Sequence, residues 1–309
     1  MDVGSTPLAS PGRPGAGTCP RRMTATGRFA AHAAGLALLV IAAGCGSDST
    51  PPDAAASVSP TVQGEQSPVG IIAIGHSGLT GESSDPDRPG EDARENSWAT
   101  GTNPEVQSIY TRMIALRPET QGHASNGASG GAVSGQLAGQ AKAALAEVPT
   151  PALAIIQTID NDIRCDGTDS QHVTEFGAAV DKALQAITGQ SPQTRVLIVG
   201  QWGRPATAAA AIARDPGSKA GVTGTGICDF FAPDGTLAPT KITALTAIIE
   251  GYEKEQARVC GTYPQCSTDD GAFAAFVDTP ERLVSGHLTI AGHVEAATLI
   301  WPKAQPLLP

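Results

Sequence analysis

The feature that most constrains the fold is an Ile-rich apolar run, residues 69–81, that breaks at a glycine and continues as a Gly-punctuated loop. A continuous apolar run of this length is typical of a parallel strand buried on both faces. In an α/β protein the residues after such a strand lie at the carboxyl edge of the sheet, where open sheets carry their ligand sites. Ser77, just after the break, is therefore the first candidate functional residue. It can act as an activated nucleophile only if a His and oxyanion donors converge on it.

The first 67 residues lack the composition of a folded domain. Residues 29–45 form a short apolar run after Arg21 and Arg22 and end in small residues, which is the pattern of a secretory signal peptide. We expect a signal peptide over residues 1–45, with Met1 or Met23 as the start, and a disordered linker over the Ser-, Pro- and Ala-rich residues 46–67. The Ala-Ala-Gly-Cys ending resembles the lipobox of bacterial lipoproteins. That resemblance would make Cys45 a lipid-modified N-terminus that anchors the chain to a membrane, with plain secretion as the alternative.

The remaining residues, 68–309, suffice for one well-buried domain. Apolar runs alternate along them with amphipathic patterns, which predicts a three-layer α/β/α sandwich with a central, mostly parallel, flavodoxin-like sheet. Residues 82–103 and 203–239 are expected to shape a pocket. Strands are predicted at 69–75, 152–159 and 195–200, a weak strand within 121–131, helices at 104–116, 132–148, 172–187, 206–214, 242–259 and 290–300, and a strand or helix at 272–277.

Charge and cysteine content exclude several classes of protein. The chain carries a net charge of −10 and has no Lys/Arg cluster in its globular part, which argues against nucleic acid as a partner. The four cysteines of this part show no C-x-x-C pair and no His at ligand spacing, so we expect no zinc site and two disulfides instead. Asp160 and Asp162 lack a third metal ligand nearby. Three connectivities are open, of which we favour Cys165–Cys228 with Cys260–Cys266.

Four short motifs carry the residue types that acyl transfer needs. Three follow expected strands, and the fourth precedes the last expected helix. Loops after neighbouring parallel strands share one sheet edge, so a Ser, a Gly N–H, an Asn amide and a His can meet there. A nucleophile, a base and two or three oxyanion donors make up the inventory of an acyl-transfer site. The motifs are Gly75-His76-Ser77, Gly130-Gly131, Asp160-Asn161-Asp162 and His287.

With these motifs in order, the chain resembles the SGNH (GDSL-type) hydrolases over nearly all of residues 68–309. The blocks that carry the resemblance are residues 75–81, 126–131, 159–162 and 287–293. The resemblance implies an ester hydrolase without a cofactor, with Ser77 as nucleophile and His287 as general base. It also implies an oxyanion hole made of the Ser77 N–H, the Gly131 N–H and the Asn161 side chain, and it leaves His293 as a bystander.

Two positions depart from the family pattern. His76 stands where the family usually has Asp, and Val284 stands where the family has the acid that orients the catalytic His. That carboxylate normally fixes the imidazole tautomer. Here either Asp278 reaches the ring or a backbone carbonyl accepts from it, and we favour the second, a Ser–His dyad.

Two alternative interpretations remain. Residues 127–131 match the G-x-S-x-G elbow of α/β-hydrolases, which would make Ser129 the nucleophile, although the residues before it are polar and small. The chain could also be a catalytically inactive surface lipoprotein that uses the scaffold for binding. Our preferred prediction is an exported, monomeric serine esterase. Its substrate is a small-molecule, glycan or lipid ester.

Overall fold

The computed structural model describes residues 67–214 and 216–309. The predicted signal peptide, the lipobox with Cys45 and nearly all of the predicted linker lie outside the described residues, so those predictions stay untested. Within the described ranges, no helix is long and apolar enough to cross a membrane.

A five-stranded parallel sheet forms the centre of the domain, as predicted, with strand order β2-β1-β3-β4-β5. The register places Gly75, the last residue of β1, opposite Gln157, the last residue of β3. Every residue of β1 and β3 is buried, as expected for strands covered on both faces. The strands are β1 (Ile71–Gly75), β2 (Ala124–Asn126), β3 (Leu153–Gln157), β4 (Arg195–Val199) and β5 (Cys266–Thr268).

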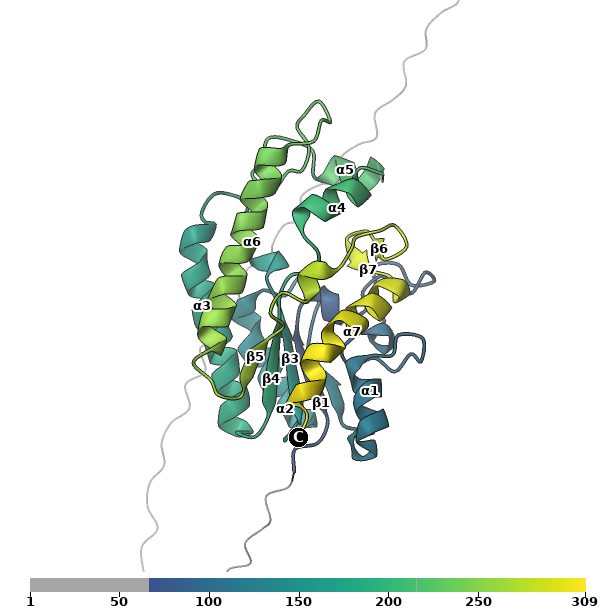
Figure 1. Ribbon diagram of the computed structural model, residues 1–309, viewed down its shortest axis with the longest axis vertical. Helices are drawn as coiled ribbons and strands as arrows, with labels where there is room; N and C mark the ends of the chain where they lie inside the picture. The colour runs from purple at the N-terminus through teal and green to yellow at the C-terminus, as the bar shows by residue number, and fades with distance from the viewer. Residues whose placement is uncertain (1–66, 215) are drawn as a thin grey trace, which may run out of the picture. The chain divides into compact units, whose positions relative to one another are not determined.

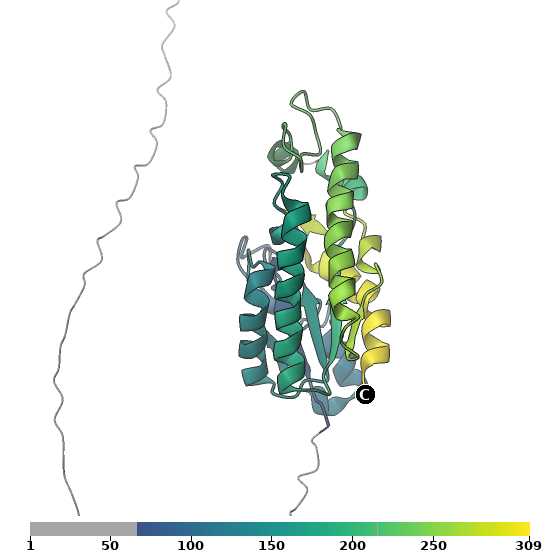
Figure 2. The same ribbon diagram turned by 90° about the vertical axis from the view of Figure 1, so that its left-hand side faces the viewer.

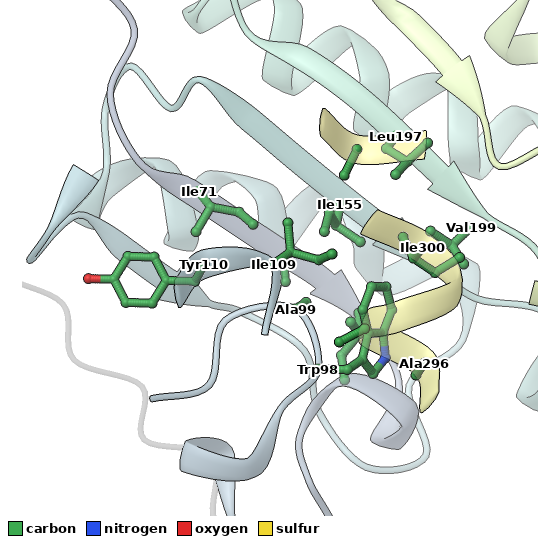
Figure 3. Packing of buried hydrophobic residues seen from close by; sticks show 14 of the residues in the cluster. Ile71, Trp98, Ala99, Ile109, Tyr110, Ile155, Leu197, Val199, Ala296 and Ile300 are labelled. Atoms are coloured by element: carbon green, nitrogen blue, oxygen red, sulfur yellow. The ribbon is translucent and has the colours of Figure 1, made fainter. Parts of the chain in front are cut away.

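Helices cover both faces of this sheet, which confirms the three-layer prediction (Figures 1 and 2). Side chains alternate along a strand, so Ile71 and Ile155 pack with α1 and α7, whereas Ile72 and Ile156 pack with α2, α3 and α6. Figure 3 shows the first of these cores. The helices are α1 (Ile109–Leu116), α2 (Leu137–Glu147), α3 (Asp169–Gln190), α4 (Pro205–Ile212), α5 (Pro216–Gly221), α6 (Pro239–Cys260) and α7 (Ile290–Ala304).

The element boundaries differ from the predictions where caps and turns decide them. The helix expected at 104–116 begins only at Ile109, because Ser108 caps it by accepting the Thr111 N–H at 3.1 Å. Residues 272–277 contain only a 3-10 turn, Phe273–Ala275. The predicted elements include neither β5 nor the hairpin of β6 (Leu283–Val284) and β7 (His287–Leu288).

Residues 205–214 and 216–238, here called the cap, lie beyond the carboxyl edge of the sheet, next to the β6–β7 hairpin (Figure 1). The cap has a small core of its own, in which Phe230 and Phe231 pack with Leu245 and Ile249 of α6. The Cys165–Cys228 disulfide ties it to the segment after β3, and Cys260–Cys266 ties the end of α6 to β5. Both favoured pairings are therefore present.

Candidate active site

The nucleophile candidate is positioned by a tight exit from the central strand. At Gly75, with φ +146°, a Cβ atom would lie 1.8 Å from the Gln157 carbonyl oxygen, so only glycine fits. The chain then turns, and Ser77 starts a 3-10 helix, Ser77–Leu79, for which the His76 side chain supplies the N-terminal cap. Within the described part of the chain the Ser77 N–H has no acceptor, so it remains free to hold an oxyanion.

The base candidate lies on the β6–β7 hairpin. Ser285 and Gly286 form its two-residue turn with φ of +49° and +79°, the sign pattern of a type I′ turn. After it, Leu288 is buried in the core and Thr289 caps α7. This arrangement brings the His287 Nε2 to 3.1 Å from the Ser77 Oγ across 210 residues of sequence.

A backbone carbonyl orients the imidazole of His287. Its Nδ1 lies 3.2 Å from the Ser285 carbonyl oxygen, which can only accept, so Nδ1 carries the hydrogen and Nε2 offers its lone pair to Ser77. The Asp278 carboxyl does not contact this ring. Its Oδ2 lies 3.0 Å from the place of a Cβ on Gly203, in the wall of the cleft described below. Ser77 and His287 therefore have the geometry of a dyad, in which Asp278 takes no part.

The two other predicted oxyanion donors lie on neighbouring turns. The Asn161 side chain donates one N–H to the Ala132 carbonyl at 3.0 Å, which ties the amide to the turn that contains Gly131. Gly131 has φ +69°, and no acceptor for its N–H occurs among the described residues. Asn161 keeps its second amide hydrogen for a ligand.

Ser129, the alternative nucleophile, lies apart from any base. Its N–H donates to the Gly75 carbonyl at 3.2 Å, and its Oγ accepts from the Gln140 Nε2 at 3.3 Å. Throughout the described ranges, no His nitrogen lies within hydrogen-bond distance of it. The geometry gives Ser129 a role in holding the loop against β1.

Two buried histidines surround the site without entering the dyad. His76 accepts the Gly78 N–H at its Nδ1 (3.1 Å), and burial with the nearby His287 lowers its pKa to about 4. His293 accepts the Trp98 N–H at 3.3 Å, and burial lowers its pKa to about 3. Both rings are therefore neutral near pH 7, and His293 has the bystander position expected of it.

Trp98, Trp202 and Glu82 complete the surroundings of the dyad, and the sequence predicted no role for the last two. Trp98 could either line a pocket or anchor the 82–103 loop on its sequence alone. It is fully buried and donates its indole N–H to the Gly78 carbonyl at 3.0 Å, so it anchors the loop. Trp202 has the pocket position instead. The Glu82 Oε1 lies 3.5 Å from the His287 Nε2. Single loop residues of this kind carry no periodic signal in the sequence.

A cleft of about 1130 Å³ opens between the cap and the hairpin, next to the Ser285–Gly286 turn. It is large enough for a sizeable ligand, since small-molecule pockets usually measure about 300–1,000 Å³. The 203–239 segment supplies more of its wall than any other segment, as expected, whereas residues 82–103, which were expected to shape the pocket as well, do not line it. The apolar part includes Ile163, Ala208, Ala211, Ile212, Val222, Phe230, Leu245, Ile249 and Leu283.

Comparison with known proteins gives similarity at the level of structure. No family model and no curated protein matches the sequence. TesA is similar at 16% identity over 77% of this chain and 99% of its own, with a TM-score of 0.48. The lipase Lip_vut3 from a goat rumen metagenome is similar at 14% identity over 76% of this chain and 97% of its own, with a TM-score of 0.49. An extracellular lipase from Streptomyces rimosus is similar at 16% identity over 75% of this chain and 98% of its own, with a TM-score of 0.42. Such identities are too low to transfer an activity, so the functional assignment depends on the side chains of this site.

Proposed function

We propose that this protein is a serine hydrolase that cleaves carboxylic esters through an acyl-enzyme on Ser77. The observation that carries the proposal is the 3.1 Å contact of the Ser77 Oγ with the His287 Nε2, in a ring whose Nδ1 faces a backbone carbonyl. A hydroxyl, a neutral imidazole with its lone pair aimed at that hydroxyl, and a fixed tautomer are the parts of an activated serine.

The geometry suggests the following reaction. His287 takes the Ser77 proton as the Oγ attacks the ester carbonyl, and the resulting imidazolium then donates that proton to the leaving alcohol. A water molecule, deprotonated by His287 in the same way, then attacks the acyl-enzyme and releases the carboxylic acid. The Glu82 carboxylate, 3.5 Å from Nε2, favours the imidazolium electrostatically.

The charge that develops on the carbonyl oxygen needs donors already in place. The Ser77 N–H, the Gly131 N–H and the free amide hydrogen of Asn161 supply them. Donors held by the fold cost no reorganisation at the moment of reaction, and one such donor is worth about 10²–10³ in rate. The adjacent cleft receives an apolar part of the ester.

The two disulfides fit a protein that works outside the cytoplasm, where such bonds persist. Export through the predicted signal peptide and anchoring through a lipid on Cys45 belong to this proposal as predictions. Detection of the protein in the membrane fraction, and its release by Cys45→Ser, would support the anchor.

The test compares Ser77→Ala with a matched control, Ser129→Ala, in hydrolysis of p-nitrophenyl acetate and p-nitrophenyl butyrate. Loss of a serine nucleophile costs roughly 10³–10⁶ in rate, so Ser77→Ala should fall close to the uncatalysed rate. Ser129→Ala should keep most of the activity. Retained activity in Ser77→Ala, or its loss only in Ser129→Ala, would contradict the proposal. A wild type without any hydrolysis would favour a binding protein instead.

A further inference from the structure

One part of the cleft, here called its inner end, carries two carboxyl groups that the proposed chemistry does not use. Asp160 follows β3, Gln201 and Trp202 follow β4, and Asp278 precedes the hairpin, and all four line the cleft. Three segments that are distant in sequence therefore place acceptor groups at one end of an otherwise largely apolar cavity.

No cationic partner neutralises these carboxyls within the described residues. The neighbour of Asp160 at ion-pair distance is the His76 Nε2, 3.6 Å from Oδ2. His76 is 1% exposed, and its Nδ1 already accepts the Gly78 N–H, so the ring stays neutral and forms no ion pair with Asp160. Burial raises the pKa of Asp160 to about 7, although a hydrogen bond with the Gln201 side chain acts to lower it. Arg204, which also lines the cleft, is held by Glu253 at 2.8 Å and by the Gly203 carbonyl at 3.0 Å.

Of the two carboxyls, Asp278 gives the stronger evidence for a bound cation. Its residue is only 7% exposed, and its Oδ1 is buried without a hydrogen-bond partner. The Gln201 Oε1, also in the cleft wall, is a second buried acceptor without a partner. Burial of an unpaired acceptor is unfavourable, and burial together with the charge of Asp160 raises the pKa of Asp278 to about 6. A bound group with positive charge would relieve this cost.

We propose that the inner end of the cleft binds an alkylammonium group of the substrate, held by the carboxyls of Asp160 and Asp278 and the indole ring of Trp202. A cation over a Trp face gains further attraction from the ring quadrupole. An organic cation fits better than a metal ion, because the described residues contain no cluster of three or more metal-ligating side chains. The rest of the cleft wall is largely apolar, with Arg204 and Arg214 as its charged side chains. The proposal rests on the proposed function, and it restricts the substrates to esters that carry an ammonium group.

The deciding experiment measures binding in the absence of turnover. Titration calorimetry of hexyltrimethylammonium bromide with the Ser77→Ala protein should show binding. Affinity should fall at least about tenfold when Asp278→Asn is added. Asp270→Asn, at an exposed carboxylate paired with Lys303, is the matched control and should leave the affinity unchanged. Absence of binding, or equal affinity with and without Asp278→Asn, overturns the proposal.

A kinetic comparison gives the second readout. Acetylcholine and its uncharged carbon isostere, 3,3-dimethylbutyl acetate, differ only in the charge, so the ratio of their kcat/KM values isolates recognition of the ammonium group. We expect a ratio above about ten in the wild type and a ratio near one in Asp160→Asn and Asp278→Asn. Cleavage of both esters at equal rates in the wild type counts against the cation site while the hydrolase stands. If the protein binds the ammonium compound but cleaves no ester, the cation site is supported and the proposed hydrolase function is contradicted.

Discussion

The two halves of the dyad are held in different ways. Ser77 follows a fully buried strand, and its neighbours Gly75, His76 and Gly78 are fixed by close backbone approach and buried hydrogen bonds. His287 directly follows a two-residue hairpin turn, Ser285–Gly286, that lines the cleft, and the buried side chain of Leu288 is its main attachment to the core. A change near Ser77 should therefore cost stability. A change near His287 should cost activity with little loss of stability.

The largest expected effect comes from Gly75→Ala. The new methyl would lie 1.8 Å from the Gln157 carbonyl, and the backbone there has φ +146°. Overpacking and backbone strain cost about 1–3 kcal/mol each, so we expect a loss of about 4 kcal/mol in the free energy of unfolding. Chemical denaturation measures it. The matched control is Gly122→Ala, with φ +84° and open space around the Cβ position, and it should lose only about 1 kcal/mol. Equal losses in both variants would contradict the crowding argument.

The next largest effect is the pH dependence of stability that His76, the neighbour of Ser77, produces. The fold lowers the pKa of His76 from its ordinary value of 6.5 to about 4, so between these values the unfolded chain binds a proton that the folded chain does not. Its contribution to stability is complete above pH 6.5 and is lost as the pH falls through 6.5 toward 4. At about 1.36 kcal/mol per pKa unit, this loss amounts to about 3 kcal/mol.

Denaturation at pH 7 and pH 4.5 tests this assignment. Only the difference between the proteins isolates His76: on going from pH 7 to pH 4.5 the free energy of unfolding should fall by about 2 kcal/mol more in the wild type than in His76→Gln. His293 acts in the same direction with a pKa of about 3. Asp160 and Asp278, with pKa values raised to about 7 and about 6, act in the opposite direction, because their charged forms are disfavoured in the fold. These groups are common to the two proteins and cancel in the comparison. An identical pH dependence in wild type and variant would contradict the neutral, buried state of His76.

The smallest effect on stability is expected on the His287 side. Gly286 has φ +79° and no atom within 4 Å of a Cβ, so Gly286→Ala should cost only about 1 kcal/mol of unfolding free energy. The same substitution should reduce kcat/KM for p-nitrophenyl esters about tenfold, because a shift of the turn moves His287 relative to Ser77. Gly122→Ala again serves as control, with the same loss of stability and unchanged activity. If Gly286→Ala keeps full activity, the turn does not position the base.

The same contrast explains what could be predicted from the sequence. The strands β1, β3 and β4 are continuous apolar runs, and the loops after two of them bring Ser77 and Asn161 to one sheet edge by topology alone. The hairpin that carries His287 could not be predicted, because its strands have two residues each and its turn depends on Ser285 at positive φ. The only local indication of the hairpin is Ser285-Gly286, which lies between the two-residue strands β6 and β7.

Features that arise from tertiary contacts could not be read from local patterns. Trp98 and Trp202 both follow polar or glycine-containing stretches, yet one is buried in the core and the other lines the cleft. The sequence suggests Asp278 only as a partner of His287, whereas the fold turns it toward Gly203 and the cleft. The place of each depends on how the cap packs over the sheet edge.

Covalent labelling tests the central claim, the activation of Ser77 by His287, most directly. The purified protein is treated with a fluorophosphonate probe, digested, and mapped by mass spectrometry, with Ser77→Ala and His287→Ala alongside. The account predicts a single adduct on Ser77 in the wild type, none in Ser77→Ala, and labelling slowed by at least about 10³-fold in His287→Ala. An adduct on Ser129, or equal labelling of Ser77 with and without His287, would contradict it.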